Sequence, residues 1–246
     1  MEIHKPHAAK TWREFFIELG TIISGILIAL ALEQVVEWSR EQHRSSEARE
    51  NIRAEIASNL GGMAVRSALE PCISRRLDEV ADIIDHPAAA GPASTPLWIG
   101  HPAFFNMKDS QYQAAAQAGH ASLLPGGEQA AYASLYAYFT HYNDWEGAEE
   151  KAWADIRTLE RRPPRSPVLD WQLRSAVQQA RIARWTMEVS AQYAQMNAAK
   201  LGVAPAKANG FKIQSACLPL HTPRAEALKQ VAEGRSIAAG LAFDKP

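Results

Sequence analysis

The apolar residues near the N-terminus form an almost unbroken run. Residues 15–36 are mostly Ile, Leu, Val, Ala and Gly, with one carboxylate near each end. As a helix, these 22 residues extend about 33 Å at 1.5 Å per residue, which is enough to cross the roughly 30 Å hydrocarbon layer of a membrane. The run therefore predicts one transmembrane helix, which begins after a capping box formed by Thr11 and Glu14.

Two other interpretations of this run stay open. Lys5, Lys10 and Arg13 precede it and Ala29-Leu30-Ala31 resembles a cleavage site, as in a secretion signal that is removed. A buried helix of a soluble protein is the other alternative, although such helices normally carry a polar face and this run has almost none.

Beyond the run, apolar residues recur every three or four positions among charged ones. This helical spacing predicts that the transmembrane helix continues as a stalk over 37–63 with one apolar stripe. Gly61-Gly62 is expected to interrupt the stalk. The stripe consists of Ala48, Ile52, Ile56, Leu60 and Met63.

The rest of the chain predicts helices rather than a sheet. Alanine dominates the apolar residues while Val, Ile and Thr are sparse, a composition typical of helices. Ser166-Pro167 is a helix start signal, and Gly119 is a stop signal. The predicted helices span 67–84, 109–117 with Asp109 as cap, 128–159, 167–201 and a short segment after Thr222-Pro223, with an irregular segment over 86–107.

The predicted fold class is all-α, with one N-terminal transmembrane helix continuing into a stalk and then a helical bundle. The basic residues Lys5, Lys10 and Arg13 keep a short arm on the cytoplasmic side, whereas a long domain crosses the membrane largely regardless of its charge. The predicted parts are a cytoplasmic arm (1–14), a transmembrane helix (15–36), a helical stalk (37–63) and a periplasmic α-helical domain (64–246) of an inner-membrane protein.

Two sets of residues mark the transmembrane helix as a docking element. Small residues let helix backbones approach closely in lipid, although membrane helices also tolerate glycine for no special reason. Glu18, Glu33, Trp12 and Trp38 lie near its ends, where they are candidate partner contacts or ordinary interfacial groups rather than an ion pathway. The small residues at helix-packing spacing are Gly20, Ser24, Gly25 and Ala29.

The chain has two cysteines, Cys72 and Cys217. In an oxidising compartment they are expected to form one disulfide between the second helix and the C-terminal segment. Closing so long a loop stabilises the fold by about 5 kcal/mol in the chain-entropy model. The alternative is a pair of buried free thiols.

Candidate catalytic chemistry is weak in this sequence. The net charge of −1 gives no electrostatic reason to expect nucleic acid. The eight histidines show no metalloprotease spacing, and no G-x-S-x-G elbow is present. His141 and Asp144 lie one helical turn apart, but ordinary surface histidines are the better interpretation. We therefore expect no catalytic residue, no metal, no cofactor and no nucleic-acid partner.

An aromatic run occupies the longest predicted helix of the bundle. At helical spacing such a run is more often core than a ligand groove or a partner surface, and both interpretations stay open. The run consists of Tyr132, Tyr136, Tyr138, Phe139, Tyr142 and Trp145.

Several motifs resemble a group of bacterial proteins. The chain begins with HKP, WREF, G-x-L-I-A-L and EQ-x-V-E in this order, and "CISRRLDEVADII" and "ACLPL" follow later. This pattern is similar to that of an uncharacterised group of single-pass inner-membrane proteins with two cysteines, over most of the chain. The resemblance implies the single-pass topology and a helical periplasmic domain, and it assigns no activity.

These features favour a binding protein over an enzyme. We expect a membrane-anchored periplasmic binding or scaffold protein, an accessory subunit of a larger inner-membrane complex. It would contact the lipid bilayer, and other membrane subunits or itself, through the transmembrane helix. The alternative is a periplasmic ligand-sensing module that signals through a separate partner, because an arm of residues 1–14 is too short to hold a signalling output domain.

Overall fold

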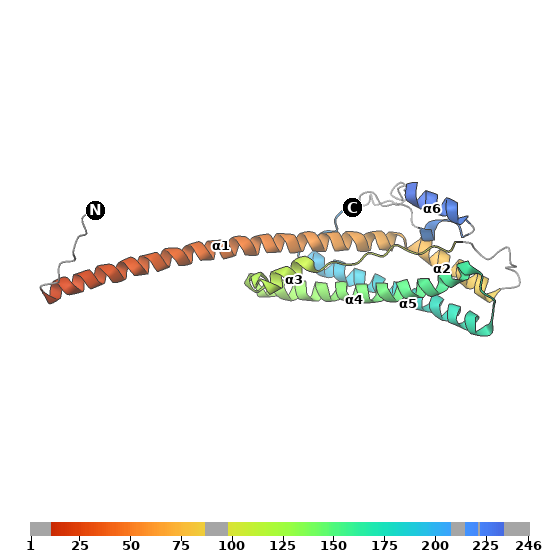
Figure 1. Cartoon of the computed structure of the whole chain (residues 1–246), viewed down its shortest axis with the longest axis horizontal. Helices are drawn as coiled ribbons and strands as arrows, with labels where there is room; N and C mark the ends of the chain where they lie inside the picture. The colour runs from red at the N-terminus through yellow and green to blue at the C-terminus, as the bar shows by residue number, and fades with distance from the viewer. Residues whose placement is uncertain (1–10, 87–97, 208–214, 221, 234–246) are drawn as a thin grey trace, which may run out of the picture.

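The computed structural model describes residues 11–86, 98–207, 215–220 and 222–233, and this part of the chain is helical without strands (Figure 1). The all-α prediction is confirmed. The elements are α1 (Trp12–Ala68), α2 (Glu70–Asp85), α3 (Ser110–Gln117), η1 (His120–Leu123), α4 (Gly126–Ile156), η2 (Arg157–Arg161), α5 (Pro167–Lys200), η3 (Ser215–Cys217) and α6 (Arg224–Glu233), where η marks 3-10 turns.

Helix α1 is one continuous element of 57 residues that extends far beyond the rest of the molecule (Figure 1). The expected interruption at Gly61-Gly62 is wrong. The glycine has another purpose, because a Cβ atom on Gly61 would lie 2.7 Å from the carbonyl oxygen of Ala206. The backbone N–H of Ala206 donates to the carbonyl of Ala57 at 2.8 Å. Gly61 therefore lets the segment after α5 cross α1 at close range.

Helix α4 runs parallel to α1. Arg49 and Arg66 of α1 form ion pairs with Glu128 and Glu149 of α4, in the same order along both helices. The side chain of Glu149 is fully buried, so the second pair lies inside the bundle. α4 therefore begins at the end of the bundle nearest the apolar run and extends away from it.

Helix α5 runs antiparallel to α1. Arg53 donates to the carbonyl of Leu201 at 2.7 Å, at the C-terminal end of α5. Ser67, fourteen positions further along α1, donates to Glu188 at 2.8 Å, which lies earlier in α5. The helices α1, α4 and α5 thus form an up-up-down bundle, and α2 covers the far half of α5.

The predicted stalk stripe is part of the bundle core. Ile52, Ile56, Leu60 and Met63 are at most 1% exposed. Ser45 is the first buried position of α1. The freestanding part of the predicted stalk is therefore short, and the packed domain begins well before position 64.

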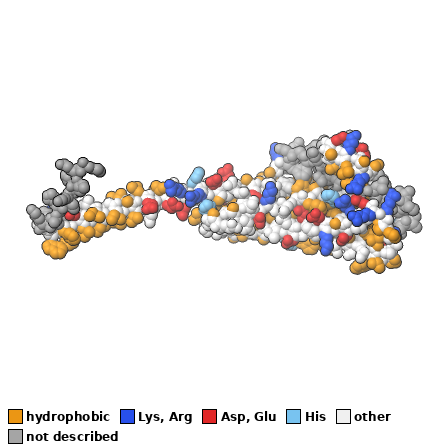
Figure 2. All heavy atoms as spheres, in the orientation of Figure 1, with side chains coloured by type: hydrophobic (Ala, Val, Ile, Leu, Met, Phe, Trp, Pro, Cys, Tyr) orange, Lys and Arg blue, Asp and Glu red, His pale blue; other side chains and the backbone are white. Residues whose placement is uncertain are grey.

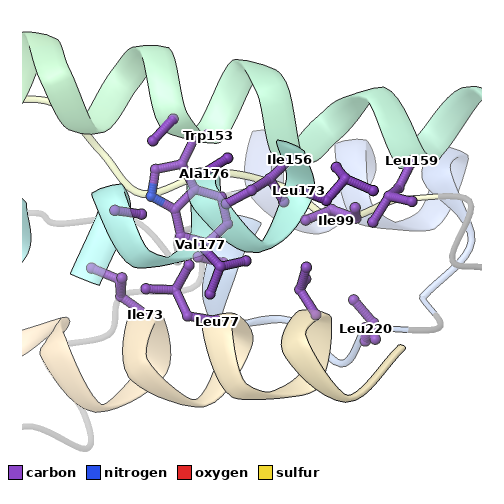
Figure 3. Close-up of a cluster of buried hydrophobic side chains, with 14 of the residues drawn as sticks. Ile73, Leu77, Ile99, Trp153, Ile156, Leu159, Leu173, Ala176, Val177 and Leu220 are labelled. Atoms are coloured by element: carbon purple, nitrogen blue, oxygen red, sulfur yellow. The ribbon is translucent and has the colours of Figure 1, made fainter. Parts of the chain in front are cut away.

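The interior consists mainly of two large apolar clusters stacked along the long axis, and a third, small cluster of Trp98, Leu218 and Ala227 joins α6 to the bundle. The cluster nearer the apolar run joins α1 to α4 and the C-terminal half of α5, with residues such as Ile56, Phe139 and Ala194. The far cluster joins α2, α4 and the start of α5, around Trp153 and Leu173 (Figure 3). The bundle therefore has two cores rather than one.

Two helix starts illustrate how local and tertiary signals combine. Ser166 caps α5 as predicted, because its side chain accepts a hydrogen bond from the backbone N–H of Leu169 at 3.2 Å. Asp109 is the cap residue of α3 but makes no side-chain capping bond. The carboxylate of Glu55, from α1, accepts the backbone N–H of Gln111 at 3.0 Å instead. A long-range carboxylate therefore replaces the predicted local cap.

The structure brings Cys72 and Cys217 together as a disulfide, with Cα atoms 4.8 Å apart. Cys72 lies in the first turn of α2, and Cys217 ends η3. The nearby Arg76 is 1% exposed and donates to the carbonyls of Ile99 and Leu218, and burial lowers the pKa of its guanidinium. The disulfide and Arg76 together fasten two irregular segments to α2.

Candidate functional site

The N-terminal part of α1 is long and apolar enough to cross a membrane. Its most apolar 18-residue window has a mean hydropathy of 2.3, and none of that window is buried in the fold. We call this part, residues 15–36, the rod. Figure 2 shows it as an exposed, mostly apolar helix that ends where charged residues become frequent. Because the rod packs against nothing in the described chain, it differs from the core helix of a soluble protein, and it is a candidate membrane span.

The predicted docking residues of the anchor lie on this exposed rod or within three residues of its ends. Trp12 and Trp38 are 78% and 64% exposed. A Cβ atom added to Gly20 or Gly25 would meet nothing within 4 Å. Glu18, Ser24, Ala29 and Glu33 are exposed as well. Their roles in partner contacts stay predictions, and the rod is free to accept another helix.

A second exposed apolar surface lies on α5. We define the outer face of α5 as the residues that recur at alternating steps of three and four and point away from the bundle. Trp171 and Trp185 on this face are 67% and 66% exposed. The outer face consists of Val168, Trp171, Ser175, Gln178, Ile182, Trp185, Val189, Gln192 and Met196.

The outer face of α5 carries no charged residue over its whole length, in a chain whose residues are 22% charged. The inner face of the same helix is made largely of small residues, among them Ala180, Ala183 and Ala194, each at most 1% exposed. Small side chains let α5 approach the aromatic face of α4 closely. The largest side chains of α5, Trp171 and Trp185, therefore point outward, which is unlike an ordinary surface helix.

Two hollows lie along the seam between α4 and α5, one beside each exposed tryptophan. The hollow beside Trp185 has a volume of about 490 Å³ and is lined by Tyr138, Val189 and Tyr193 among others. The rings of Tyr138 and Tyr193 stack with their centroids 5.5 Å apart. The hollow beside Trp171 has a volume of about 480 Å³. The seam is thus a broken groove beside the outer face.

His141 and Ser190 meet at the first hollow, but their geometry is not that of a catalytic pair. The indole N–H of Trp145 donates to His141 Nε2 at 3.0 Å, so this nitrogen is an acceptor and Nδ1 holds the proton. Nδ1 then donates to Ser190 Oγ at 2.9 Å, and Ser190 donates to the carbonyl of Thr186. His141 therefore cannot take a proton from Ser190 in this arrangement.

The other candidate partner of His141, Asp144, forms no hydrogen bond or ion pair with it. His141 bonds Trp145 and Ser190 instead. Among the described residues, no group of three metal-ligating side chains is close enough to hold an ion. The histidine–carboxylate pair is therefore not assembled as a site.

A group of buried and half-buried charges lies in the bundle, on α1, α4 and α5. We define the charged layer as Arg66, Glu146, Glu149, Arg184 and Glu188. Arg66 donates to both carboxylate oxygens of Glu149 at 2.6 Å, and both side chains are buried. Burial raises the pKa of Glu146, although the backbone N–H of Phe105 donates to its carboxylate and opposes that effect. This layer is structural, since it faces neither hollow.

The aromatic run divides between core and surface. Tyr132, Tyr136, Phe139 and Tyr142 are at most 5% exposed, so the core interpretation holds for them. Tyr138 lines the seam. Trp145 is partly buried and donates to His141, which also lines the hollow. The groove interpretation therefore survives for this end of the run, joined by α5 aromatics that the run did not include.

No family model, curated protein or solved structure matches this chain. The motif resemblance stays an expectation. Sequence reasoning missed the outer face of α5, although a signal was present. The apolar residues of 167–201 fall on two opposite stripes, and a helix that packs on one side only needs one.

Proposed function

We propose that this protein is a membrane-anchored binding or scaffold protein, with its N-terminus in the cytoplasm, a single span in the inner membrane, and its helical bundle in the periplasm. The single observation that carries the proposal is α1, whose first part is an exposed apolar rod and whose second part is the core of the bundle. A chain built this way fastens a folded domain to a membrane.

Three further observations support a binding role in a larger assembly. The rod has small residues with open space around them, at Gly20 and Gly25. The outer face of α5 resembles the core of a protein interface, which is poor in charge and rich in aromatics. The histidine–serine pair is oriented for structure rather than for catalysis. We therefore propose an accessory subunit rather than an enzyme.

Topology is tested with reporters fused after Pro246. A reporter that is active only in the periplasm should be active, and one that is active only in the cytoplasm should be silent. The expected orientation follows from the basic arm containing Lys5, Lys10 and Arg13. The reverse pattern, or recovery of the reporter in a soluble fraction with the N-terminus cleaved, would contradict the anchor.

The disulfide gives an independent test of the compartment. Mass mapping without reductant should find Cys72 joined to Cys217 in protein prepared from cells. Cys72→Ser is expected to lower the free energy of unfolding by about 2–5 kcal/mol. Complete alkylation of both thiols without reductant would argue for a reducing compartment and against the periplasmic location.

The rod is tested as a docking element by Gly25→Leu and Gly20→Leu. Both substitutions fill open space without lowering hydrophobicity, so insertion and bundle stability should not change. Co-purification of membrane partners, or self-association in detergent, should fall. If both variants keep every association of the wild type, the rod is a plain anchor.

A ligand-sensing module is the second candidate, and the hollow beside Trp185 favours it. Aromatic rings on both sides of a hollow of about 490 Å³ suit a small planar ligand. Indole and free aromatic amino acids are suitable probes in a thermal-shift measurement on the full chain. A probe that raises the melting temperature of the wild type but not of Trp185→Ala would move this candidate ahead.

A further inference from the structure

The outer face of α5 is an exposed apolar surface on the described part of the bundle, and no described segment covers Trp171 or Trp185. We propose that a second copy of this chain docks there, so that two α5 helices lie side by side in parallel about a two-fold axis perpendicular to the membrane. The proposal deepens the proposed function and rests on its anchoring step, because the anchor orients the copies.

The charge distribution favours a second copy over a different protein. In a parallel helix pair with the two-fold axis between the helices, each residue of the contact faces its own copy, so a charge there would face a like charge. The outer face has none. At its edge, Arg174 and Arg181 pair with Asp85 and Asp78 of α2, at 2.7 and 2.6 Å. Nothing on this face therefore requires an oppositely charged partner.

The spacing and the polar residues of the face also suit a parallel pair. Steps of three and four give the seven-residue repeat in which two parallel helices keep one seam facing the partner. Gln178 and Gln192 alternate with Trp171 and Trp185 along the outer face. A side-chain amide holds both a donor and an acceptor, so it can pair with the same residue of its copy.

The anchor supplies the required orientation. α5 lies along α1, antiparallel to it, as the contacts of Arg53 and Ser67 show. Two copies anchored in one membrane point the same way and stand at the same height. Each residue of the outer face is then level with its own copy, which is the condition for a parallel two-fold contact.

The size of the face indicates a contact that depends on the membrane. From Val168 to Met196 the face extends about 42 Å, at 1.5 Å per residue. With a helix about 10 Å wide, each copy buries roughly 420 Å² and the pair about 840 Å², less than the roughly 1,200 Å² of a stable interface. Confinement to one membrane raises the effective concentration of the copies and makes up the difference.

The test is cysteine cross-linking of the full chain in native membranes without reductant. Gln178→Cys lies on the expected axis, so mild oxidation should give a covalent dimer. The matched control is Ala154→Cys, which is exposed on α4 in a hollow shared with Arg157 and Arg224, away from the outer face. It should stay monomeric.

A second substitution tests the face itself. Adding Trp185→Glu to Gln178→Cys places one glutamate from each copy face to face at the contact between the two α5 helices. It should reduce the dimer about tenfold or more, a ratio equivalent to about 1.4 kcal/mol or more. Adding Ala154→Glu should not reduce it, and the melting temperature of both variants should match that of the wild type because both positions are exposed.

Three results would overturn the proposal. One is equal cross-linking at 178 and 154, and another is no dimer at 178. The third is loss of a different co-purifying protein in Trp185→Glu without any dimer in the parent, which would assign the face to that protein. In all three cases, pelleting of the chain with membranes and the reporter at Pro246 still report separately on the proposed function.

Discussion

The two parts of α1 are both apolar, but they have different surroundings. In the first part, residues such as Leu27 and Leu32 are 60% and 63% exposed, whereas Leu60 and Met63 in the second part are at most 1% exposed. The first part is apolar on every side, and the second is apolar along one stripe. Composition therefore separates a helix that meets lipid from one that meets protein, even when no break divides them.

The largest expected effect concerns the end of the second part, where Arg66 pairs with Glu149. Arg66→Met removes the partner of a buried carboxylate, and we expect it to lower the free energy of unfolding by about 3–5 kcal/mol. Denaturant unfolding of the full chain in detergent measures it. The double variant Arg66→Met/Glu149→Leu leaves neither member of this pair as an unpaired buried charge and should recover most of the loss. A double variant as unstable as the single one would show that packing, not charge, sets the effect.

The next prediction compares one residue type in the two parts. Leu60→Ala opens a cavity in the core and should lower the free energy of unfolding by about 2–5 kcal/mol. Leu27→Ala is the matched control on the rod, where the change should be within about 0.5 kcal/mol. Thermal unfolding followed by aromatic circular dichroism reads the bundle in both variants. Equal losses would mean that the rod packs on the bundle.

The smallest expected effect concerns the pH dependence at Glu146, in the charged layer. Its folded pKa is raised, so the folded state holds this proton more tightly than the unfolded state does. The resulting stabilisation is present below the ordinary pKa of Glu and is lost as the pH rises through the raised value. Glu146→Gln keeps an acceptor for the N–H of Phe105 without the charge. It should raise the melting temperature above this window and leave it unchanged well below.

Much of the fold could be predicted because its signals are local. The rod is evident from composition, the stripe through Ile56 from helical period, and the start of α5 from Ser166-Pro167. The turn at Gly119 has a positive φ of 78°, as its residue type predicts. Each of these features depends on a few neighbouring positions, which is the range over which a sequence pattern carries information.

The features that could not be predicted depend on distant segments. Gly61 looks like a helix breaker until Ala206 is seen against it. Asp109 looks like a cap, but Glu55, more than fifty positions away, accepts those hydrogen bonds. For the site, the anchor was predictable. The outer face of α5 was missed because a second apolar stripe, opposite the inner alanine stripe, does not by itself say which stripe packs on the bundle.

Because α1 is one uninterrupted helix, the orientation of the bundle is coupled to that of the membrane segment. Eight residues, 37–44, lie between Val36 at the end of the rod and Ser45, the first buried side chain described in α1, so Ser45 is about 14 Å beyond Val36 along the helix axis. No helix break lies in between, so a rotation of the membrane segment about its axis passes to the bundle. Each residue inserted between 37 and 44 turns the bundle by about 100° and moves it by about 1.5 Å along the helix axis. The direction in which the outer face points is thus set by the length of one helix. A neighbour that rotates the rod about its axis also changes the direction of Trp185.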